Sequence, residues 1–332
     1  MKTFPAQYST LAASALKEHI EEVYGFRGLT CRLLVHNVSD TYILESEQAK
    51  YIFKVYRKDY RTLNEIKGEV ELLNILKDNS IPVSYPLTDL AGKQIQYFKA
   101  IEGMRYGVLF TFATGKVVLN PDDEQLKIIG RTMALMHHAT STCKLKHERI
   151  IYDIYSTVRG PLKLIRSRFE DLSQEYTYLQ DLGAKVVAKL DEYDLTRFSY
   201  GYCHYDLLPK NFHFDDDNNI TIFDFDWAGK ALLVNDVMTF MVQLFFMARH
   251  QMITKEEADH KLKILIEAYR ENRSLSDPEI ELIPYLGIMY WIHAFGFYEA
   301  NYDDFAITFF TPRFIKERVE LIKVWVEWYC KF

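Results

Sequence analysis

The sequence predicts an α+β fold in two parts, a small part with a sheet and one main helix and a larger, mainly helical part. Short runs rich in β-branched and aromatic residues dominate up to about residue 110. After it, long segments carry apolar residues at three- and four-residue spacing. We therefore divide the chain into residues 1–110 and 111–332. We expect a ligand in the cleft between the two parts, which is a common place for one.

The small part is expected to hold four strands, each a short apolar run between polar turns. These runs cover 31–36, 41–46, 51–57 and 106–112. A strong helix extends from about Leu63 to Lys77 and ends before the break at Ile81-Pro82. Residues 1–23 have the apolar spacing of a further, amphipathic helix and lack the continuous apolar core of a signal peptide.

The larger part is expected to be helical except at 199–227. Its clearest helical patterns cover 124–139, 256–272 and 313–329. Between 199 and 227, two short β-like runs flank the segments DLLPKN and DDDNN. The DDDNN segment, residues 215–219, is typical of a solvated hairpin turn.

Composition excludes several classes of protein. The net charge is −6 and no long basic run occurs, so we expect no nucleic-acid partner. No apolar stretch is long enough to cross a bilayer, so we expect no membrane partner. The four cysteines are scattered, which argues against a disulfide framework or a zinc site and favours a reducing cytoplasm. Aromatic residues reach 15%, most of them expected in the core and some in a ligand pocket.

The segment from Tyr202 to Asp226 carries the chemistry. It places His204, Asp206 and Asn211 in the pattern H-x-D-x-x-x-x-N, and Asp224 follows within an apolar run. In phosphoryl transfer, a carboxylate orients the attacking hydroxyl and can accept its proton, a task that Asp206 fits. Mg²⁺ prefers oxygen ligands, which Asn211 and Asp224 offer. We interpret His204 as a residue that holds the loop by hydrogen bonds.

An aspartate between Phe223 and Phe225 is expected to be buried, and a buried charge needs a partner or a metal. This expectation strengthens the interpretation of Asp224 as a metal ligand. The alternative, a polar loop followed by a half-buried strand, explains these residues less well.

This segment resembles the catalytic and metal-binding loops of the protein-kinase-like superfamily. It is most similar to the aminoglycoside phosphotransferase and choline kinase family, which includes bacterial homoserine kinases of that fold. The resemblance implies a two-lobed protein-kinase-like fold, with an antiparallel sheet and one helix in the N-lobe and a larger helical C-lobe. It further implies ATP and Mg²⁺, with Asp206 catalytic, Asn211 and Asp224 binding the metal and Asp236 buttressing the site.

Two departures from the pattern stand in the catalytic loop. Protein kinases carry a lysine two residues after the catalytic aspartate, where this chain has Leu208, and this favours small-molecule kinases. Small-molecule members often have glycine where this chain has Tyr205.

A lysine and a glutamate in the small part support the same interpretation. Lys54 lies inside an apolar strand. Glu69 is followed at +3, +4 and +7 by three leucines, so it lies on the buried stripe of its helix, whereas Glu71 lies on a more exposed face. A glutamate that faces the core needs a cation, and Lys54 is the nearest candidate. Kinase-like folds use such a pair to hold the α- and β-phosphates. Glu65 is the fallback partner.

The resemblance also places the nucleotide. Backbone groups from Thr111 to Ala113 correspond to the hinge that pairs with adenine, by analogy alone. The loop that covers the phosphates falls at 36–41, HNVSDT, which has no glycine. Ser39 is a candidate phosphate contact. His137 and His138, at the end of a predicted helix, are expected to pack or cap.

The phosphate acceptor is expected to be a small molecule with a hydroxyl group: an aminoglycoside-like antibiotic, homoserine, choline or another amino alcohol. An aromatic and acidic cluster near the C-terminus either forms a cage for an amine or belongs to the core; its members are Trp291, Tyr298, Glu299 and Asp303. Two alternatives remain open, a bacterial serine/threonine protein kinase of the same fold and a nucleotide-binding pseudokinase. The sequence does not indicate the oligomeric state.

Overall fold

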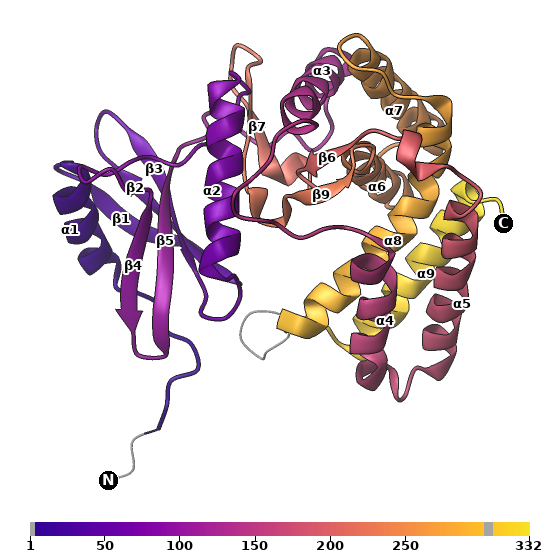
Figure 1. The fold of residues 1–332 in the computed structure, drawn as a ribbon, viewed down its shortest axis with the longest axis horizontal. Helices are drawn as coiled ribbons and strands as arrows, with labels where there is room; N and C mark the ends of the chain where they lie inside the picture. The colour runs from indigo at the N-terminus through magenta and orange to yellow at the C-terminus, as the bar shows by residue number, and fades with distance from the viewer. Residues whose placement is uncertain (1–3, 302–307) are drawn as a thin grey trace. The chain divides into compact units, whose positions relative to one another are not determined.

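The computed structural model describes residues 4–301 and 308–332. The chain forms two compact units, which are described separately (Figure 1). Unit 1 comprises Met1–Thr114, Leu145–Glu148 and Thr221–Phe223, and unit 2 comprises Gly115–Lys144, Arg149–Ile220 and Asp224–Phe332. Strands concentrate in unit 1 and helices in unit 2, so the predicted α+β class is confirmed.

Unit 1 is built on a five-stranded sheet in which every neighbouring pair is antiparallel. The strand order is β1-β2-β3-β5-β4. The strands are β1 (Thr30–His36), β2 (Ser39–Glu45), β3 (Lys50–Tyr56), β4 (Ile95–Ala100) and β5 (Gly103–Thr111). Four of them lie where the sequence predicts strands. The fifth, β4, was not among the runs predicted from the sequence.

Two helices accompany this sheet. Figure 1 shows α1 (Ala13–Tyr24) and α2 (Leu63–Asp78) on opposite sides of the strands. Along β3, Phe53 and Val55 pack into one core cluster with residues of α1. Because side chains alternate along a strand, Lys54 points to the other face. The alternation of β3 thus separates a packing face from a face that carries a lysine.

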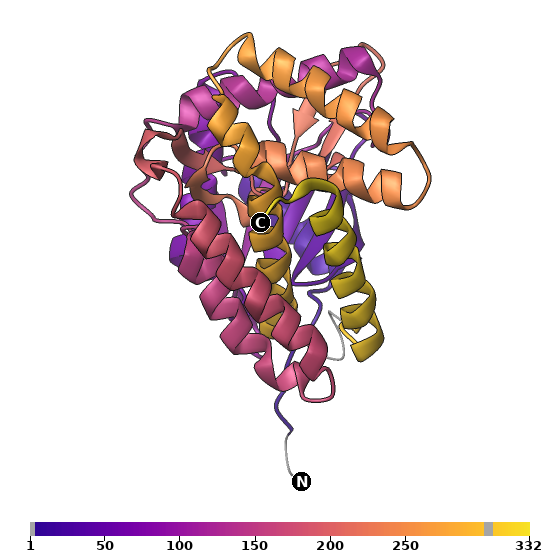
Figure 2. The same cartoon turned by 90° about the vertical axis from the view of Figure 1, so that its right-hand side faces the viewer.

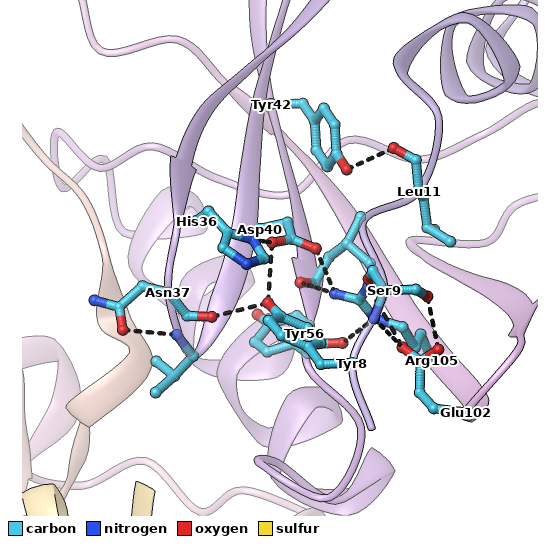
Figure 3. A network of polar contacts seen from close by, with 12 residues as sticks. Tyr8, Ser9, Leu11, His36, Asn37, Asp40, Tyr42, Tyr56, Glu102 and Arg105 are labelled. Atoms are coloured by element: carbon cyan, nitrogen blue, oxygen red, sulfur yellow. Dashed lines mark hydrogen bonds and ion pairs between the residues drawn. The ribbon is translucent and has the colours of Figure 1, made fainter. Parts of the chain in front are cut away.

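The N-terminal helix is shorter than predicted. It begins at Ala13, and the residues before it are held on the sheet by polar contacts (Figure 3). At the centre, the fully buried Arg105 donates to Oδ2 of Asp40 at 2.8 Å and to the carbonyl oxygen of Ser9. Tyr8 donates its hydroxyl to Oδ1 of Asp40 at 3.0 Å, and the Ser9 hydroxyl donates to Glu102 at 2.6 Å. These bonds hold residues 8 and 9 in an extended path that a helix could not follow.

Unit 2 is mainly helical (Figure 2). Its longer helices are α3 (Asp123–Thr140), α5 (Ser173–Leu190), α6 (Asn235–Arg249), α7 (Lys255–Arg270), α8 (Asp277–Asn301) and α9 (Pro312–Tyr329), with the short α4 (Gly160–Ile165) before α5. Helix α8 contacts α4, α5, α6 and α9, and α3 packs along α7. By length and composition α8 could cross a membrane, contrary to the expectation from sequence. However, 61% of its most apolar window is buried inside the fold, as in a core helix.

Four short strands flank the loops that contain the predicted residues Asp206, Asn211 and Asp224. β6 (Tyr200–Cys203) pairs antiparallel with β9 (Gly229–Leu232), and β7 (Phe212–Phe214) pairs with β8 (Ile220–Ile222). The turn between β7 and β8 is the predicted DDDNN turn. There Asp215 accepts the backbone N–H groups of Asp217 and Asn219 at 3.0 and 2.8 Å. The loop between β6 and β7 and the turn after β8 hold the candidate residues.

Candidate active site

A buried carboxylate anchors the loop after β6. Asp236, at the start of α6, is fully buried and accepts the backbone N–H groups of His204 at 2.9 Å and Tyr205 at 2.7 Å. Nε2 of His137, from α3, lies 2.9 Å from the same carboxylate, and Tyr269 contacts the other ring nitrogen of His137. Residues of α3, α6 and α7 thus hold the loop where it leaves β6, and Asp236 lies where it can support the site as predicted.

Tyr205 adopts a backbone conformation that favours glycine. Its φ is 63°, in the left-handed region, where a side chain costs about 1–2 kcal/mol. The ring is buried and stacks on Tyr152 with 3.4 Å between ring centroids and 5° between planes. Packing of the ring and the N–H bond to Asp236 therefore hold the conformation that a glycine would adopt without strain.

Asp206 is surrounded by donors. Nδ2 of Asn211 lies 2.8 Å from Oδ2 of Asp206, and Nζ of Lys210 lies 2.9 Å from the same oxygen. The hydroxyl of Tyr290, from α8, donates to Oδ1 at 3.3 Å. The backbone N–H of Asp206 donates to Nδ1 of the buried His204 at 3.3 Å, so His204 holds the loop as predicted. The carboxylate is oriented from both sides and remains partly exposed.

Asn211 presents an oxygen that fits a divalent cation. It is buried, and its Nδ2 donates both to Oδ2 and to the backbone oxygen of Asp206, each at 2.8 Å. These bonds use the nitrogen side of the amide, so Oδ1 is the atom left to ligate a metal. An amide oxygen and a carboxylate are ligands of the type that Mg²⁺ prefers. The chemistry of the donors thus fits the predicted metal.

The burial predicted for Asp224 was wrong. Asp224 lies two residues after the end of β8, is exposed, and has φ 62° and ψ 62°. The left-handed turn places its side chain outside the apolar layer, while Phe225 after it is buried. Arg149 supports this turn by donating to the backbone oxygens of Phe225 at 3.1 Å and Ala228 at 2.8 Å. The argument from a buried charge therefore fails, and the metal-ligand role rests on the chemistry of the carboxylate.

The charge of Lys210 connects the two aspartates. Neighbouring atoms partly desolvate the ammonium and disfavour its charge, although the side chain is 61% exposed; the charge and hydrogen bond of Asp206, with the charge of Asp224, outweigh this and raise the pKa of Lys210 above its usual value. The ammonium therefore stays charged and lies within electrostatic range of both carboxylates. Sequence reasoning missed Lys210 and Tyr290. The position of Lys210, directly before Asn211, was a usable signal, whereas Tyr290 lies 84 residues from its partner.

In unit 1, Lys54 and Glu69 are both buried. Nζ of Lys54 lies 5.2 Å from the ring centroid of Tyr56. The fallback residue, Glu65, accepts from the N–H and hydroxyl of Thr62 at 2.8 Å each, in a capping box at the start of α2. Because Glu65 has this structural task, Glu69 is the better partner. The pairing itself stays a prediction.

The predicted nucleotide contacts are Thr111, Ala113 and Ser39, all in unit 1. The N–H of Thr111 donates to the backbone oxygen of Tyr85 at 3.0 Å, and its carbonyl oxygen accepts from the hydroxyl of Ser84 at 2.6 Å. Both backbone groups of Thr111 are thus hydrogen-bonded within unit 1. The predicted adenine contact of Thr111 and Ala113 stays a prediction. Ser39 is buried at the start of β2. Its predicted phosphate contact stays a prediction.

Of the two interpretations of the C-terminal aromatic and acidic cluster, the structure agrees with the core for Trp291, which is buried. The guanidinium of Arg318, from α9, already lies over the ring of Trp291, with 4.9 Å from Cζ to the ring centroid. Glu299 pairs with Arg168 at 2.8 Å. Asp303 lies outside the described residues. A protein cation therefore takes the place proposed for an amine on Trp291.

A second group of potential metal ligands is structural. The ligand atoms of His137, Cys203 and Asp236 lie within 4.8 Å of one another, and all three residues are buried. Burial, with the nearby charge of Asp236, raises the pKa of Cys203 well above its usual value, so the thiol stays protonated. A protonated thiol beside an already hydrogen-bonded carboxylate is a poor metal site.

Two relatives share most of the chain in sequence. An uncharacterised protein of Deinococcus radiodurans is 28% identical over 285 residues, which cover 86% of this chain and 81% of that protein. A homoserine kinase of Sinorhizobium medicae is 24% identical over 249 residues, which cover 75% of this chain and 72% of the kinase.

Solved structures show the same fold. An amicoumacin kinase in complex with AMP-PNP, Ca²⁺ and Ami superposes with a TM-score of 0.74 at 20% identity, covering 92% of this chain and 93% of that one. The predicted kinase-like fold is therefore confirmed. The sequence profile of the phosphotransferase enzyme family matches residues 30–273, which span the sheet of unit 1 and the loops around Asp206 and Asp224. The chain belongs to the phosphotransferase enzyme family.

Proposed function

We propose that the protein transfers the γ-phosphate of ATP to a hydroxyl group of a small molecule. The observation that carries this proposal is the setting of Asp206, a partly exposed carboxylate held by Asn211, Lys210 and Tyr290. Membership of the phosphotransferase enzyme family supports the class of reaction. The related homoserine and amicoumacin kinases support an acceptor of small size.

The two oxygens of Asp206 have different tasks in this proposal. Oδ2 receives both the Asn211 amide and the Lys210 ammonium, whereas Oδ1 receives only the long Tyr290 bond among the described residues. Oδ1 therefore orients the acceptor hydroxyl and takes its proton. The hydroxyl oxygen forms a bond to the γ-phosphorus, the bond from that phosphorus to the β,γ-bridging oxygen breaks, and ADP leaves with the electron pair.

Asn211, through Oδ1, and Asp224 would hold the divalent cation, for which we propose Mg²⁺. Bound there, the ion would neutralise charge on the phosphates. The amicoumacin kinase complex with AMP-PNP and Ca²⁺ supports the use of a nucleotide and a divalent cation. In unit 1, Lys54 with Glu69 would hold the α- and β-phosphates, Ser39 would contact phosphate, and the segment that ends at Ala113 would pair with adenine.

The experiment is an ATP-consumption screen of hydroxylated metabolites, amino alcohols and aminoglycosides, with and without Mg²⁺. We expect at least one acceptor to raise turnover above the background hydrolysis of ATP. Asp206→Asn is expected to lower kcat with that acceptor by about two to four orders of magnitude, because it removes the proton acceptor. Affinity for ATP should be retained.

The same screen separates the alternatives. A protein kinase would label added proteins in preference to small molecules, and a pseudokinase would bind ATP without turnover. Turnover that is unaffected by Asp206→Asn would contradict the proposed role of this carboxylate.

A further inference from the structure

Arg318, on α9, is a half-buried cation that packs against α8, the helix whose Tyr290 contacts Asp206, and the mechanism does not use it. Its Cζ lies 5.0 Å from the ring centroid of Phe246, 4.9 Å from that of Trp291 and 5.0 Å from that of Phe314. The three rings come from α6, α8 and α9. Contacts of this kind stabilise the charge and fix the guanidinium in one place.

These contacts leave the hydrogen-bonding capacity of Arg318 unused. A guanidinium carries five N–H donors, and aromatic faces do not replace oxygen acceptors. Within residues 4–301 and 308–332, no carboxylate or carbonyl oxygen accepts a bond from Arg318. A partly desolvated charge without a counter-ion is costly, so a functional reason for it is expected.

The neighbouring phenols do not supply the missing negative charge. Burial raises the pKa of Tyr290 well above its usual value, and burial also raises that of Tyr298, so both hydroxyls are neutral near pH 7. Burial in turn lowers the pKa of Arg318, against the opposing influence of these two tyrosines. A guanidinium remains charged at physiological pH even so, because its usual pKa exceeds 12.

The same tyrosines connect Arg318 with the reacting end of the site. Tyr290 donates to Oδ1 of Asp206 at 3.3 Å, and the next residue on α8, Trp291, lies against Arg318. Tyr298, two turns further along α8, lies within electrostatic range of Arg318, Lys210 and Asp206. One helix thus carries contacts both to the proposed base and to a cation that has no acidic partner among the described residues, and all these residues belong to unit 2.

We infer that Arg318 binds a carboxylate of the acceptor, so that the acceptor is a hydroxyl compound that carries a carboxylate, such as a hydroxy amino acid. The inference rests on the proposed phosphotransferase function and selects among its acceptors. It disfavours acceptors whose only charged group is an amine, since these would place a cation beside Arg318. Asp206 receives the hydroxyl, and Arg318 positions the other end of the molecule.

The test compares acceptors that differ only by the carboxylate. L-Homoserine is matched with 3-aminopropan-1-ol, and L-threonine with 1-aminopropan-2-ol. For the wild-type chain, we expect kcat/KM to be about tenfold to a hundredfold higher for at least one acid than for its decarboxylated partner. This ratio corresponds to the free energy of one hydrogen bond to a charged group. Arg318→Met is expected to raise KM for that acid by a similar factor and to leave the KM of the amino alcohol within about twofold.

Two further variants control the result. Arg318→Lys keeps the charge and is expected to restore part of the preference for the acid. Arg313→Met removes a charge from the same helix, where Arg313 is exposed and pairs with Glu317 at 2.7 Å, and should change neither KM. Calorimetric titration of L-homoserine and 3-aminopropan-1-ol measures the same preference as binding affinity. Because it needs no turnover, it can be used even if Arg318→Met is inactive.

The outcomes distinguish the two proposals. If the wild-type chain phosphorylates the amino alcohols as well as the acids, or if Arg318→Met affects both members of a pair equally, the inference about Arg318 is overturned while phosphotransfer stands. If ATP turnover responds to no compound in the wider screen, the proposed function fails. In that case, failure of L-homoserine to bind more tightly than 3-aminopropan-1-ol in the titration also overturns the carboxylate site.

Discussion

Lys210 and Asp206 form an ion pair inside the catalytic loop, with 2.9 Å between Nζ and Oδ2. The chain has leucine at position 208, where protein kinases carry a lysine, and it brings a lysine to the carboxylate from position 210. Because Asn211 donates to the same oxygen, Oδ2 has two donors, and under the proposed function Oδ1 is the oxygen that receives the acceptor hydroxyl. Lys210 is a positioning residue in this arrangement, and its ammonium stays charged.

Removal of the Lys210 ammonium should impair turnover more than substrate binding. Lys210→Met is expected to lower kcat by about tenfold to a hundredfold, because a charged hydrogen bond that orients the base is lost. KM for the acceptor should change by less than about threefold. Steady-state kinetics with the acceptor found in the screen provides the measurement.

Two variants control this prediction. Lys210→Arg keeps the charge and should recover part of kcat. Lys323→Met breaks an exposed pair with Glu320 and should leave kinetics unchanged. A fall in kcat that Lys210→Arg does not relieve at all would contradict the positioning role.

Substitution of Tyr205 by glycine should destabilise the protein, although glycine suits the left-handed conformation. Glycine relieves about 1–2 kcal/mol of backbone strain at φ 63°. However, loss of a buried aromatic ring costs about 3–5 kcal/mol. Tyr205→Gly is therefore expected to lower the free energy of unfolding by about 1–4 kcal/mol in urea denaturation. Tyr205→Ala loses the ring without relief of strain, so a stability equal to or above that of Tyr205→Gly would contradict the argument.

Asp224 should control the requirement for the divalent cation. Asp224→Asn removes one negative charge from the proposed ligand set, so the Mg²⁺ concentration for half-maximal turnover is expected to rise about tenfold or more. The measurement is a Mg²⁺ titration of turnover at saturating ATP. Asp216→Asn, in the exposed turn between β7 and β8, is the matched control and should not change the titration. Equal half-saturation in wild type and Asp224→Asn would exclude Asp224 as a ligand.

Much of the fold could be predicted because its signals are local. The runs at 31–36, 41–46 and 51–57 are rich in β-branched and aromatic residues between polar turns, and they became β1, β2 and β3 within a residue or two. The N-terminal helix was predicted too long. Its apolar spacing continues before Ala13, but the hydrogen bonds of Tyr8 to Asp40 and of Ser9 to Glu102 hold that stretch extended. These bonds join residues far apart in the sequence, so no local sequence pattern predicts them.

The residues of the candidate site were likewise predictable only where they lie close together in the sequence. His204, Asp206 and Asn211 are close in sequence, so their pattern predicted a loop that the structure forms, with Asn211 against Asp206. Tyr290 reaches Asp206 from the distant helix α8, and Arg318, on α9, lies against Trp291 of the same helix, so their placement depends on how α8 and α9 pack. For Asp224, the local pattern was present but misleading. Its two flanking phenylalanines suggested burial, and a left-handed turn exposes it instead.

The buried pair of Arg105 and Asp40 should contribute strongly to the stability of unit 1. Both side chains are fully buried, and Arg105 also donates to the backbone oxygens of Tyr56 at 3.1 Å and Val55 at 3.2 Å (Figure 3). Arg105→Met leaves Asp40 charged and buried without its main partner, so unfolding should become easier by about 3–5 kcal/mol. Urea denaturation measures this loss.

A double variant shows whether the unpaired charge causes the loss. Arg105→Met with Asp40→Asn removes both charges, so it should be more stable than the sum of the single changes predicts, by about 1 kcal/mol or more. Arg131→Met breaks an exposed pair with Glu271, 2.6 Å apart, and is expected to cost less than about 1 kcal/mol. If the two single losses simply add, the ion pair is not the source of the stability, and the bonds from Arg105 to the backbone oxygens are.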